Sequence, residues 1–315
     1  MKRFLGILFL SLILNSCDDG DLFLEDINFD NATVAKCETN GIIYKLNEKE
    51  ALLLELPRLV LPNETKTQSV IIGGENRVVY RFYDGKVSQA NICETIPPGT
   101  PIVTDQWNAT AGIVEIASTP IKKIDETNNS TRITGYNHFI VLRNITFKKS
   151  DGKDQTYPEF VFGNQVTMAT LLPFAFTQAL NRCTVSKNIY NFIKSEALTL
   201  SNIDPELIKS ESTPLNTPRV GLLGTTKNSL VYKSYNGLLT GDFFCTTTPP
   251  LTPTVLQEWK AAAGIANSEG IIEVTTTTFG TGYKHTIILK KAKMTRGEDS
   301  FLLGDTYIYG ELITN

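Results

Sequence analysis

Short runs in which apolar and polar residues alternate recur along most of the chain. VVYRFY (78–83) stops at the turn pair Asp84-Gly85, and LVYKSY (230–235) stops at Asn236-Gly237. Alternation that ends at such a pair is typical of antiparallel strands. Further strand-like runs are 42–46, 50–56, 113–116, 133–147, 160–167, 271–274, 281–294 and 307–314. The pattern predicts a mainly β protein, although the run 50–56 also fits a helix.

The same landmarks occur twice along the chain, in the same order. They are Cys37, Cys93, Trp107 and GYNHFIVL (135–142) in the first copy, and Cys183, Cys245, Trp259 and GYKHTIIL (282–289) in the second. Such a duplication predicts two homologous tandem domains of α+β, mainly β class, each an antiparallel sheet or sandwich with one short helix. The expected domains are residues 28–168 and 173–315, with a linker over 169–172.

The short helix of each copy is predicted over 101–111 and 253–263. Each of these segments begins with proline and is preceded by threonine, whose hydroxyl can cap a helix, and each is followed by glycine. Trp107 and Trp259 have apolar residues four positions before and after them, which places each indole on an apolar stripe. We therefore expect both indoles to be buried against a sheet. Exposed indoles would instead offer a surface on which a sugar can stack.

His138 and His285, the two histidines of the chain, occupy matched positions in the two copies. On a strand, His138 shares its face with Tyr136 and Ile140, and such an apolar face favours a hydrogen-bonded core histidine over a ligand or a base. We therefore predict no catalytic residue, no metal site and no cofactor. The residues kept as possible ligand contacts are Trp107, Trp259, His138 and His285.

Four of the five cysteines divide evenly between the copies. Two cysteines in each copy predict the disulfides Cys37–Cys93 and Cys183–Cys245 in a protein outside the cytoplasm, with free buried thiols as the alternative. A zinc site is disfavoured because no two cysteines are close in sequence and the two histidines lie in different copies.

The fifth cysteine, Cys17, follows an apolar run. Lys2 and Arg3 precede residues 4–14, which are too few to span a bilayer but typical of a secretory signal. The run ends in LNSC (14–17), which resembles a bacterial lipobox, the site at which cysteine becomes the lipid-bearing first residue of the mature protein. The resemblance implies a signal peptide over 1–16 and lipidation of Cys17.

The acidic segment CDDGD (17–21) resembles the export signal of surface lipoproteins in Bacteroidota-type bacteria. It implies a lipid-anchored outer-membrane or cell-surface protein in which residues 17–27 are the tether. The formal net charge of −3 and the lack of a basic cluster disfavour nucleic acid as a partner.

The expected function is a non-catalytic binding or scaffolding role in the envelope. Tandem β-rich domains on a lipid tether resemble, in architecture alone, the accessory glycan-binding lipoproteins of starch-utilisation-type systems. That resemblance implies a glycan ligand, and an envelope protein is the other possible partner besides the membrane. The alternatives are an envelope hydrolase that uses carboxylate chemistry and a purely structural component of an envelope complex.

Overall fold

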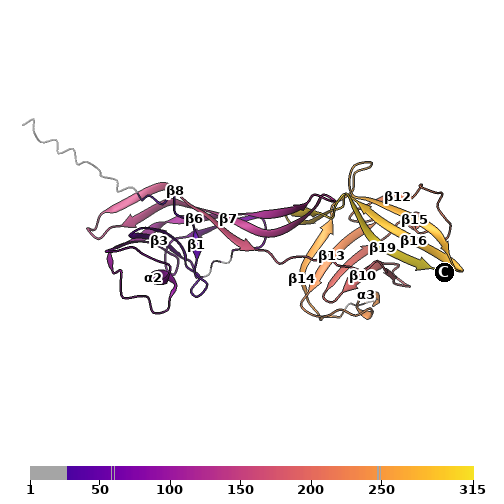
Figure 1. Ribbon diagram of the computed structural model, residues 1–315, viewed down its shortest axis with the longest axis horizontal. Helices are drawn as coiled ribbons and strands as arrows, with labels where there is room; N and C mark the ends of the chain where they lie inside the picture. Colours follow the sequence, from indigo (N-terminus) through magenta and orange to yellow (C-terminus); the bar gives the residue numbers. More distant parts are fainter. Residues whose placement is uncertain (1–26, 58, 60, 247, 249) are drawn as a thin grey trace, which may run out of the picture. The chain divides into compact units, whose positions relative to one another are not determined.

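The computed structural model describes residues 27–315 except 58, 60, 247 and 249, so Cys17 and the predicted signal peptide lie outside the described residues. Three antiparallel sheets account for most of the described chain (Figure 1). The expected mainly β fold is confirmed. The run 50–56, for which a helix was the alternative, contains a strand.

The first copy forms one sheet of eight strands in the order β1-β2-β3-β5-β6-β7-β8, and β4 pairs with β6 as well. β5 pairs with the first part of β6, with Tyr80 opposite Trp107, whereas β4 pairs with the later part, with Gln68 opposite Ile116. The elements are β1 (Ala35–Lys36), β2 (Ile43–Asn47), β3 (Glu50–Glu55), β4 (Lys66–Ile71), β5 (Arg77–Tyr83), α2 (Ala90–Cys93), β6 (Val103–Asp125), β7 (Ser130–Lys148) and β8 (Asp154–Met168).

The second copy forms two sheets. One has seven strands in the order β9-β10-β11-β13-β14-β17-β18, and the other has four in the order β12-β15-β16-β19. The elements are β9 (Asn181–Arg182), β10 (Ile189–Ile193), β11 (Glu196–Ser201), the short helix η1 (Pro205–Leu207), β12 (Arg219–Leu222), β13 (Ser229–Tyr235), α3 (Asp242–Cys245), β14 (Val255–Ala261), β15 (Ile271–Phe279), β16 (Gly282–Lys290), β17 (Lys293–Arg296), β18 (Asp299–Leu302) and β19 (Thr306–Thr314).

The two copies have the same strand order if each of the three long strands of the first copy is matched with two shorter strands of the second. β6, β7 and β8 are continuous in the first copy, whereas their counterparts are interrupted in the second, as β14 and β15, β16 and β17, and β18 and β19. Tyr232 lies opposite Trp259, as Tyr80 lies opposite Trp107. This correspondence of order and register is expected of a duplicated domain.

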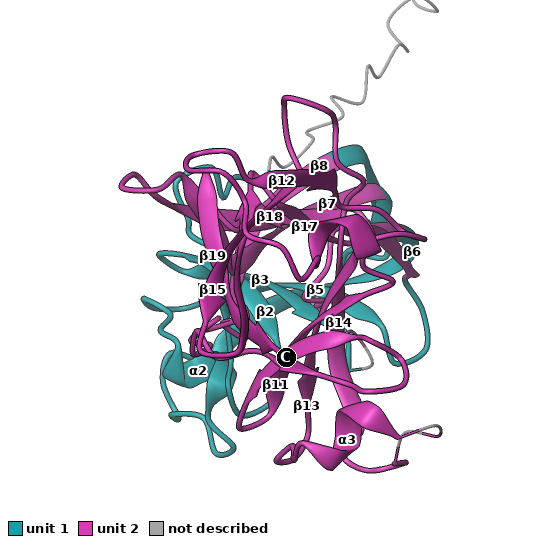
Figure 2. Ribbon diagram, turned by 90° about the vertical axis from the view of Figure 1, so that its right-hand side faces the viewer, with its two compact units in different colours: residues 1–57, 72–112, 144–159 teal, residues 58–71, 113–143, 160–315 magenta. Residues whose placement is uncertain are grey.

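The chain divides into two compact units (Figure 2). Of the described residues, unit 1 holds those in 27–57, 72–112 and 144–159, and unit 2 holds the remainder. β6, β7 and β8 therefore have residues in both units. The predicted domain bounds, 28–168 and 173–315 with a linker at 169–172, stay a prediction.

The helices predicted over 101–111 and 253–263 are wrong, because these segments contain the strands β6 and β14. A spacing of four residues is a multiple of the strand period of two, so an apolar residue at every fourth position also marks one face of a strand. Each copy does have a four-residue helix, but it lies earlier, at α2 and α3, and ends at the second cysteine of the copy.

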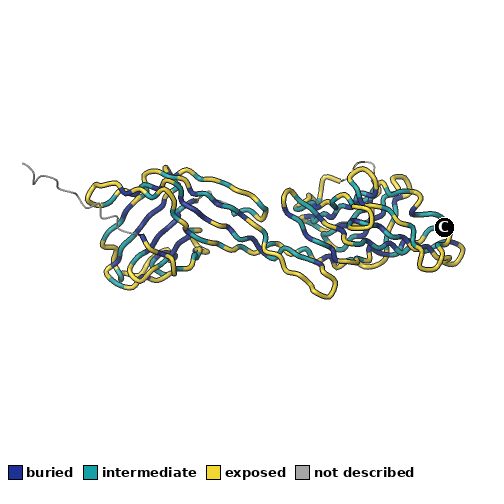
Figure 3. The backbone as a smooth tube through the Cα atoms, turned by 90° about the horizontal axis from the view of Figure 1, so that it is seen from above, coloured by how far each residue is buried: buried dark blue, intermediate teal, exposed yellow. Residues whose placement is uncertain are grey.

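The core of unit 2 lies between its seven-stranded and four-stranded sheets. Leu198 and Tyr232 come from one sheet, and Ile272 and Ile287 from the other, and all four are buried in one cluster. Alternate residues of these strands point inward, as a sheet that is apolar on one face requires. Figure 3 shows this alternation of buried and exposed positions along the chain.

Unit 1 has a cluster of buried side chains around the Cys37–Cys93 disulfide. Tyr44, Leu53 and Val79, from three neighbouring strands, pack there together with the disulfide. Both predicted disulfides, Cys37–Cys93 and Cys183–Cys245, are confirmed, and each has a Cα–Cα distance of 5.3 Å. Each lies within one unit.

Candidate functional site

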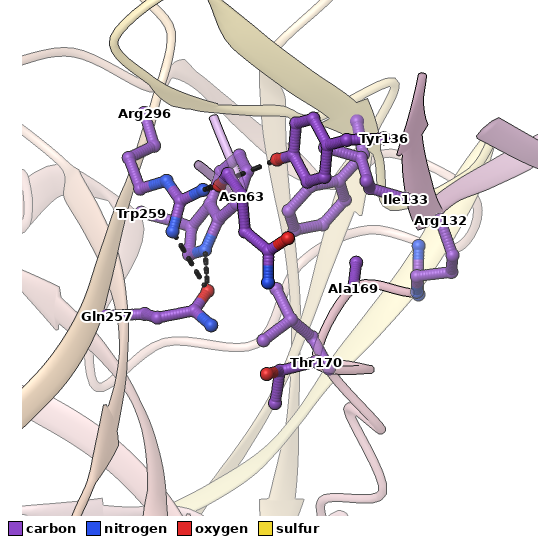
Figure 4. A pocket seen from close by; sticks show the side chains of 11 residues that line it. Asn63, Arg132, Ile133, Tyr136, Ala169, Thr170, Gln257, Trp259 and Arg296 are labelled. Carbon is purple, nitrogen blue, oxygen red and sulfur yellow. Dashed lines mark hydrogen bonds between the residues drawn. The ribbon is translucent and has the colours of Figure 1, made fainter. Parts of the chain in front are cut away.

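A pocket of about 350 Å³, a volume that includes the solvent at its mouth, lies in unit 2 (Figure 4). We call it the unit 2 pocket. Its walls come from the segment before β4, from β7, from residues 169–172 and from β14, β17 and β18. The lining residues are Asn63, Arg132, Ile133, Tyr136, Ala169, Thr170, Leu172, Gln257, Trp259, Arg296 and Phe301.

One wall is an indole covered by a cation. The Arg296 guanidinium lies 4.7 Å from the centre of the Trp259 ring. The Gln257 Oε1 atom accepts from Trp259 Nε1 at 3.1 Å and from Arg296 Nη1 at 3.2 Å, as the dashed lines in Figure 4 show. Both lone pairs of this oxygen are thereby used, and the Gln257 NH₂ group is left to donate to a ligand.

The Asp299 carboxylate is buried, with 1% exposure, and supports the wall formed by Arg296 and Trp259 through its ion pair with Arg296. It accepts from the Tyr136 hydroxyl at 2.8 Å, from the Thr65 backbone N–H at 3.1 Å and from the Thr65 hydroxyl, and it forms an ion pair with Arg296 at 3.4 Å. Burial and the hydrogen bond to Asp299 raise the pKa of Tyr136 well above its ordinary value, so Tyr136 stays a donor.

Arg132 forms the opposite wall and is fixed between two aromatic rings. Its guanidinium lies 5.0 Å from the centre of the Phe174 ring and 5.4 Å from that of Phe301. Arg132 Nη1 donates to the Thr131 carbonyl at 2.7 Å and to the Leu302 carbonyl at 2.9 Å. Burial lowers the pKa of Arg132, partly offset by Tyr307 and Asp125.

The first copy repeats the arrangement around Trp259 at Trp107. Lys149 Nζ lies 4.6 Å from the centre of the Trp107 ring, and Trp107 Nε1 donates to Asp105 Oδ2 at 3.0 Å. Both indoles are 2% exposed, so neither presents an open face for stacking. Trp259 lines the unit 2 pocket through a ring whose face is already covered by Arg296, whereas Trp107 belongs to unit 1.

The two histidines lie outside the unit 2 pocket and are fully buried. His138 is hydrogen-bonded through Nδ1 to the Ser118 hydroxyl and through Nε2 to the Thr167 hydroxyl, both at 2.8 Å. His285 repeats this with Thr276 at 2.8 Å and Thr314 at 2.9 Å. Each imidazole thus bridges two hydroxyls from neighbouring strands, which is the geometry of a satisfied core histidine.

We expect the His285 bridge to make folding depend on pH. Burial, with the Arg219 and Arg182 charges, lowers the pKa of His285 to about 4. A histidine in the unfolded chain has a pKa of about 6.5. Below that pH the unfolded chain therefore binds a proton at His285 that the folded chain does not bind until the pH is near 4. The free energy of unfolding should therefore fall by roughly 3 kcal/mol as the pH decreases from about 6.5 to about 4.

Urea unfolding of Trp107→Phe and of Trp107→Phe with His285→Gln at several pH values, followed by Trp259 fluorescence, checks this expectation. Glutamine keeps a donor and an acceptor for Thr276 and Thr314 but does not titrate, so its stability should change less over this pH interval. His138 is present in both proteins, and its effect cancels in the difference. Equal pH dependence of the two proteins would contradict the assignment.

The sequence pointed to Trp259 but missed Asn63, Arg132 and Arg296. Arg296 and Lys149 each cover the tryptophan of their copy, but they differ in residue type, so comparison of the two copies in sequence did not identify them. Among the described residues, no three His, Cys, Asp or Glu side chains gather at one place as metal ligands, and no helix has the length and apolar composition to cross a membrane. Comparisons of the chain with protein-family models, with curated proteins and with solved structures find no match.

Proposed function

We propose that the protein is a lipid-anchored envelope protein that binds a saccharide, without catalysis, in the unit 2 pocket. The observation that carries the proposal is the set of hydrogen-bonding side chains in the pocket walls that no protein group satisfies. The half-buried Gln257 amide nitrogen, and the exposed Asn63 side-chain amide and Thr170 hydroxyl, have no hydrogen-bond partner among the described residues and are open to a ligand or to water. A ligand rich in hydroxyl groups would satisfy them.

The enclosed part of the unit 2 pocket is small. Its volume is about 20 Å³, room for about one water molecule, and the rest of the pocket is open to solvent. A saccharide would therefore lie across the mouth, with one polar group inserted into the pocket. The pocket walls are fixed by the Asp299 and Gln257 hydrogen bonds, so little conformational entropy is lost when a ligand binds.

The side chains of the pocket favour binding over hydrolysis. Glycoside hydrolysis by carboxylates requires a pair of Asp or Glu residues on either side of the scissile bond. None of the described residues that line the unit 2 pocket is Asp or Glu, and the nearby Asp299 carboxylate is buried behind the wall by four interactions. We therefore prefer a binding role to the hydrolase alternative.

The test uses the full chain in a bacterial host that processes lipoproteins. Membranes that carry the protein should retain a labelled monosaccharide or short oligosaccharide from a panel, and Cys17→Ser should remove this activity from the membrane fraction. Asn63→Ala with Thr170→Val should weaken the retention about tenfold or more, a change of roughly 1.4 kcal/mol. Thr278→Val, at an exposed position of β15, is the matched control.

Failure to retain any saccharide of the panel would refute the binding role. Retention that Asn63→Ala with Thr170→Val leaves unchanged would place the ligand elsewhere on the protein. Equal amounts of wild type and Cys17→Ser in the membrane fraction would remove the lipid anchor from the proposal.

A second candidate function is docking of an envelope protein by two proline-rich loops, 94–102 and the described residues 250–254. Ile96 is 85% exposed in the first loop, and Leu251 is 92% exposed in the second. Each loop is held to the preceding turn by the same hydrogen bond, from the Ile102 N–H to Asp84 at 2.9 Å and from the Thr254 N–H to Asn236 at 2.8 Å. Exposed apolar side chains on loops fixed in this way favour a protein partner.

A further inference from the structure

Two arginines line the unit 2 pocket, and they differ in how their charge is balanced. Arg296 is paired with the buried Asp299 carboxylate at 3.4 Å. Arg132 forms no ion pair with any of the described residues; its contacts are two backbone carbonyls and two aromatic rings. A partly buried guanidinium without a carboxylate partner is unusual, because charges removed from water are ordinarily paired.

The contacts of Arg132 leave one edge of the guanidinium to donate. Both Nη1 hydrogens are used by the Thr131 and Leu302 carbonyls. The Nε and Nη2 hydrogens, which form the adjacent edge, donate to no group among the described residues, and Phe174 and Phe301 fix the plane. Two parallel N–H groups in a fixed plane match the two oxygens of a carboxylate.

The surroundings of Arg132 favour an anion. No acidic residue lines the pocket among the described residues, and the Asp299 charge is compensated by Arg296. The other pocket-lining groups that are open to hydrogen bonding are neutral, namely the Asn63 and Gln257 amides and the Thr170 hydroxyl. The pocket therefore combines neutral hydrogen-bonding groups with one positive charge that forms no ion pair among the described residues and that the Asp125 charge offsets only in part.

The aromatic side chains disfavour a neutral sugar as the preferred ligand. Neutral sugars are commonly held by an open aromatic face, but Tyr136, Trp259 and Phe301 are each no more than 2% exposed. Binding energy must therefore come from hydrogen bonds, and a charge-assisted bidentate pair is the strongest hydrogen bond that this pocket offers.

On the premise that the pocket binds a saccharide, we propose that its ligand is a uronic acid, a sugar that carries a carboxylate. The carboxylate binds the Nε–Nη2 edge of Arg132. The hydroxyl groups of the ring bind the Asn63 and Gln257 amides and the Thr170 hydroxyl. The positive pocket and the hydrogen-bonding wall thus recognise two parts of one small molecule.

Isothermal titration calorimetry of the full chain with D-glucuronate and D-galacturonate, compared with D-glucose and D-galactose, tests the proposal. Each uronate should bind about tenfold or more tightly than its neutral counterpart, and the preference should weaken as the salt concentration rises. Sodium acetate, which carries the carboxylate alone, should bind more weakly than either uronate.

Variants at Arg132 assign the preference to this side chain. Arg132→Met keeps an unbranched apolar stem between Phe174 and Phe301, and it should abolish the preference for uronates while weak binding of neutral sugars persists. Arg132→Lys keeps the charge without the planar fork and should give an intermediate preference. Lys293→Gln, which removes an exposed charge of β17, is the control and should leave the preference unchanged.

The outcomes separate this proposal from the proposed function. Equal affinity of the wild type for uronates and neutral sugars overturns the uronic-acid assignment and leaves saccharide binding intact. Acetate binding as tight as that of the uronates also overturns the assignment, because the ligand would then be a carboxylate without a sugar. Absence of binding for all four sugars overturns the proposed function itself. The comparison of ligands on the wild type holds even if an Arg132 variant does not fold.

Discussion

Replacing both cysteines of one disulfide by alanine is expected to lower the free energy of unfolding of its unit by about 4 kcal/mol. The Cys37–Cys93 and Cys183–Cys245 bridges close chain segments of 56 and 62 residues. Cross-links over segments of this length remove a large part of the entropy of the unfolded chain. The loss is comparable to the whole stability of many small domains, so each double variant should be close to unfolding at ambient temperature.

Each unit contains one disulfide and one tryptophan, which makes the measurement specific to a unit. Urea unfolding followed by Trp107 fluorescence in a Trp259→Phe background reports unit 1, and the converse background reports unit 2. Removal of the Cys37–Cys93 bridge should shift the Trp107 transition more than the Trp259 transition. A shift of less than about 1 kcal/mol in the matching unit would contradict the expected contribution.

The strands could be predicted because alternation of apolar and polar residues is visible within a short segment. The disulfides could be predicted because each copy contains two cysteines. Alternation followed by a turn pair identified β5 and β13, and the even number of cysteines in each copy identified both bridges. The helix prediction failed because apolar residues four positions before and after Trp107 and Trp259 fit both the helix period of about 3.6 and the strand period of about 2. The β-branched residues of these segments, such as Val103, agree with the strand.

The repeated glycine of the GYNH and GYKH segments has a reason that only the structure shows. A Cβ atom at Gly135 would overlap the carbonyl oxygen of Thr167, and one at Gly282 would overlap that of Thr314. The same two threonines hold His138 and His285 through their hydroxyls. The repeat therefore keeps glycine and histidine together because both are needed for one close approach of strands.

The unit 2 pocket could not be predicted from the sequence, because its walls come from segments far apart in the chain. Asn63, Arg132 and Arg296 carry no motif, and their positions follow from which strands end beside one another. Trp259 and Trp107 occur at matched positions in the two copies, but the role that they share is packing against a cationic side chain. Trp259 also lines the unit 2 pocket, and no residue pattern around it in the sequence indicates this second role.

Asp299→Asn is expected to lower the free energy of unfolding of unit 2 by about 3–5 kcal/mol, the usual loss when one partner of a buried ion pair is removed. Arg296 would lose its compensating charge, and the amide nitrogen of asparagine cannot accept from Tyr136 or Thr65. Because these contacts hold one wall of the unit 2 pocket, saccharide binding should weaken as well. The matched control is Asp154→Asn, whose carboxylate is 58% exposed and pairs with Lys148 at 3.4 Å. Its loss should cost less than about 1 kcal/mol.

A double-mutant cycle separates the buried hydrogen bond from a general loss of packing. Tyr136→Phe alone should cost about 1–3 kcal/mol, because it leaves one acceptor of the Asp299 carboxylate without its donor. Tyr136→Phe combined with Asp299→Asn should cost less than the sum of the two single changes, with a coupling energy of about 0.5–3 kcal/mol. Additive losses, or a loss for Asp299→Asn no larger than that of Asp154→Asn, would show that the carboxylate does not hold this wall. The unit 2 pocket would then lack the rigid side on which Gln257 and Arg296 are positioned.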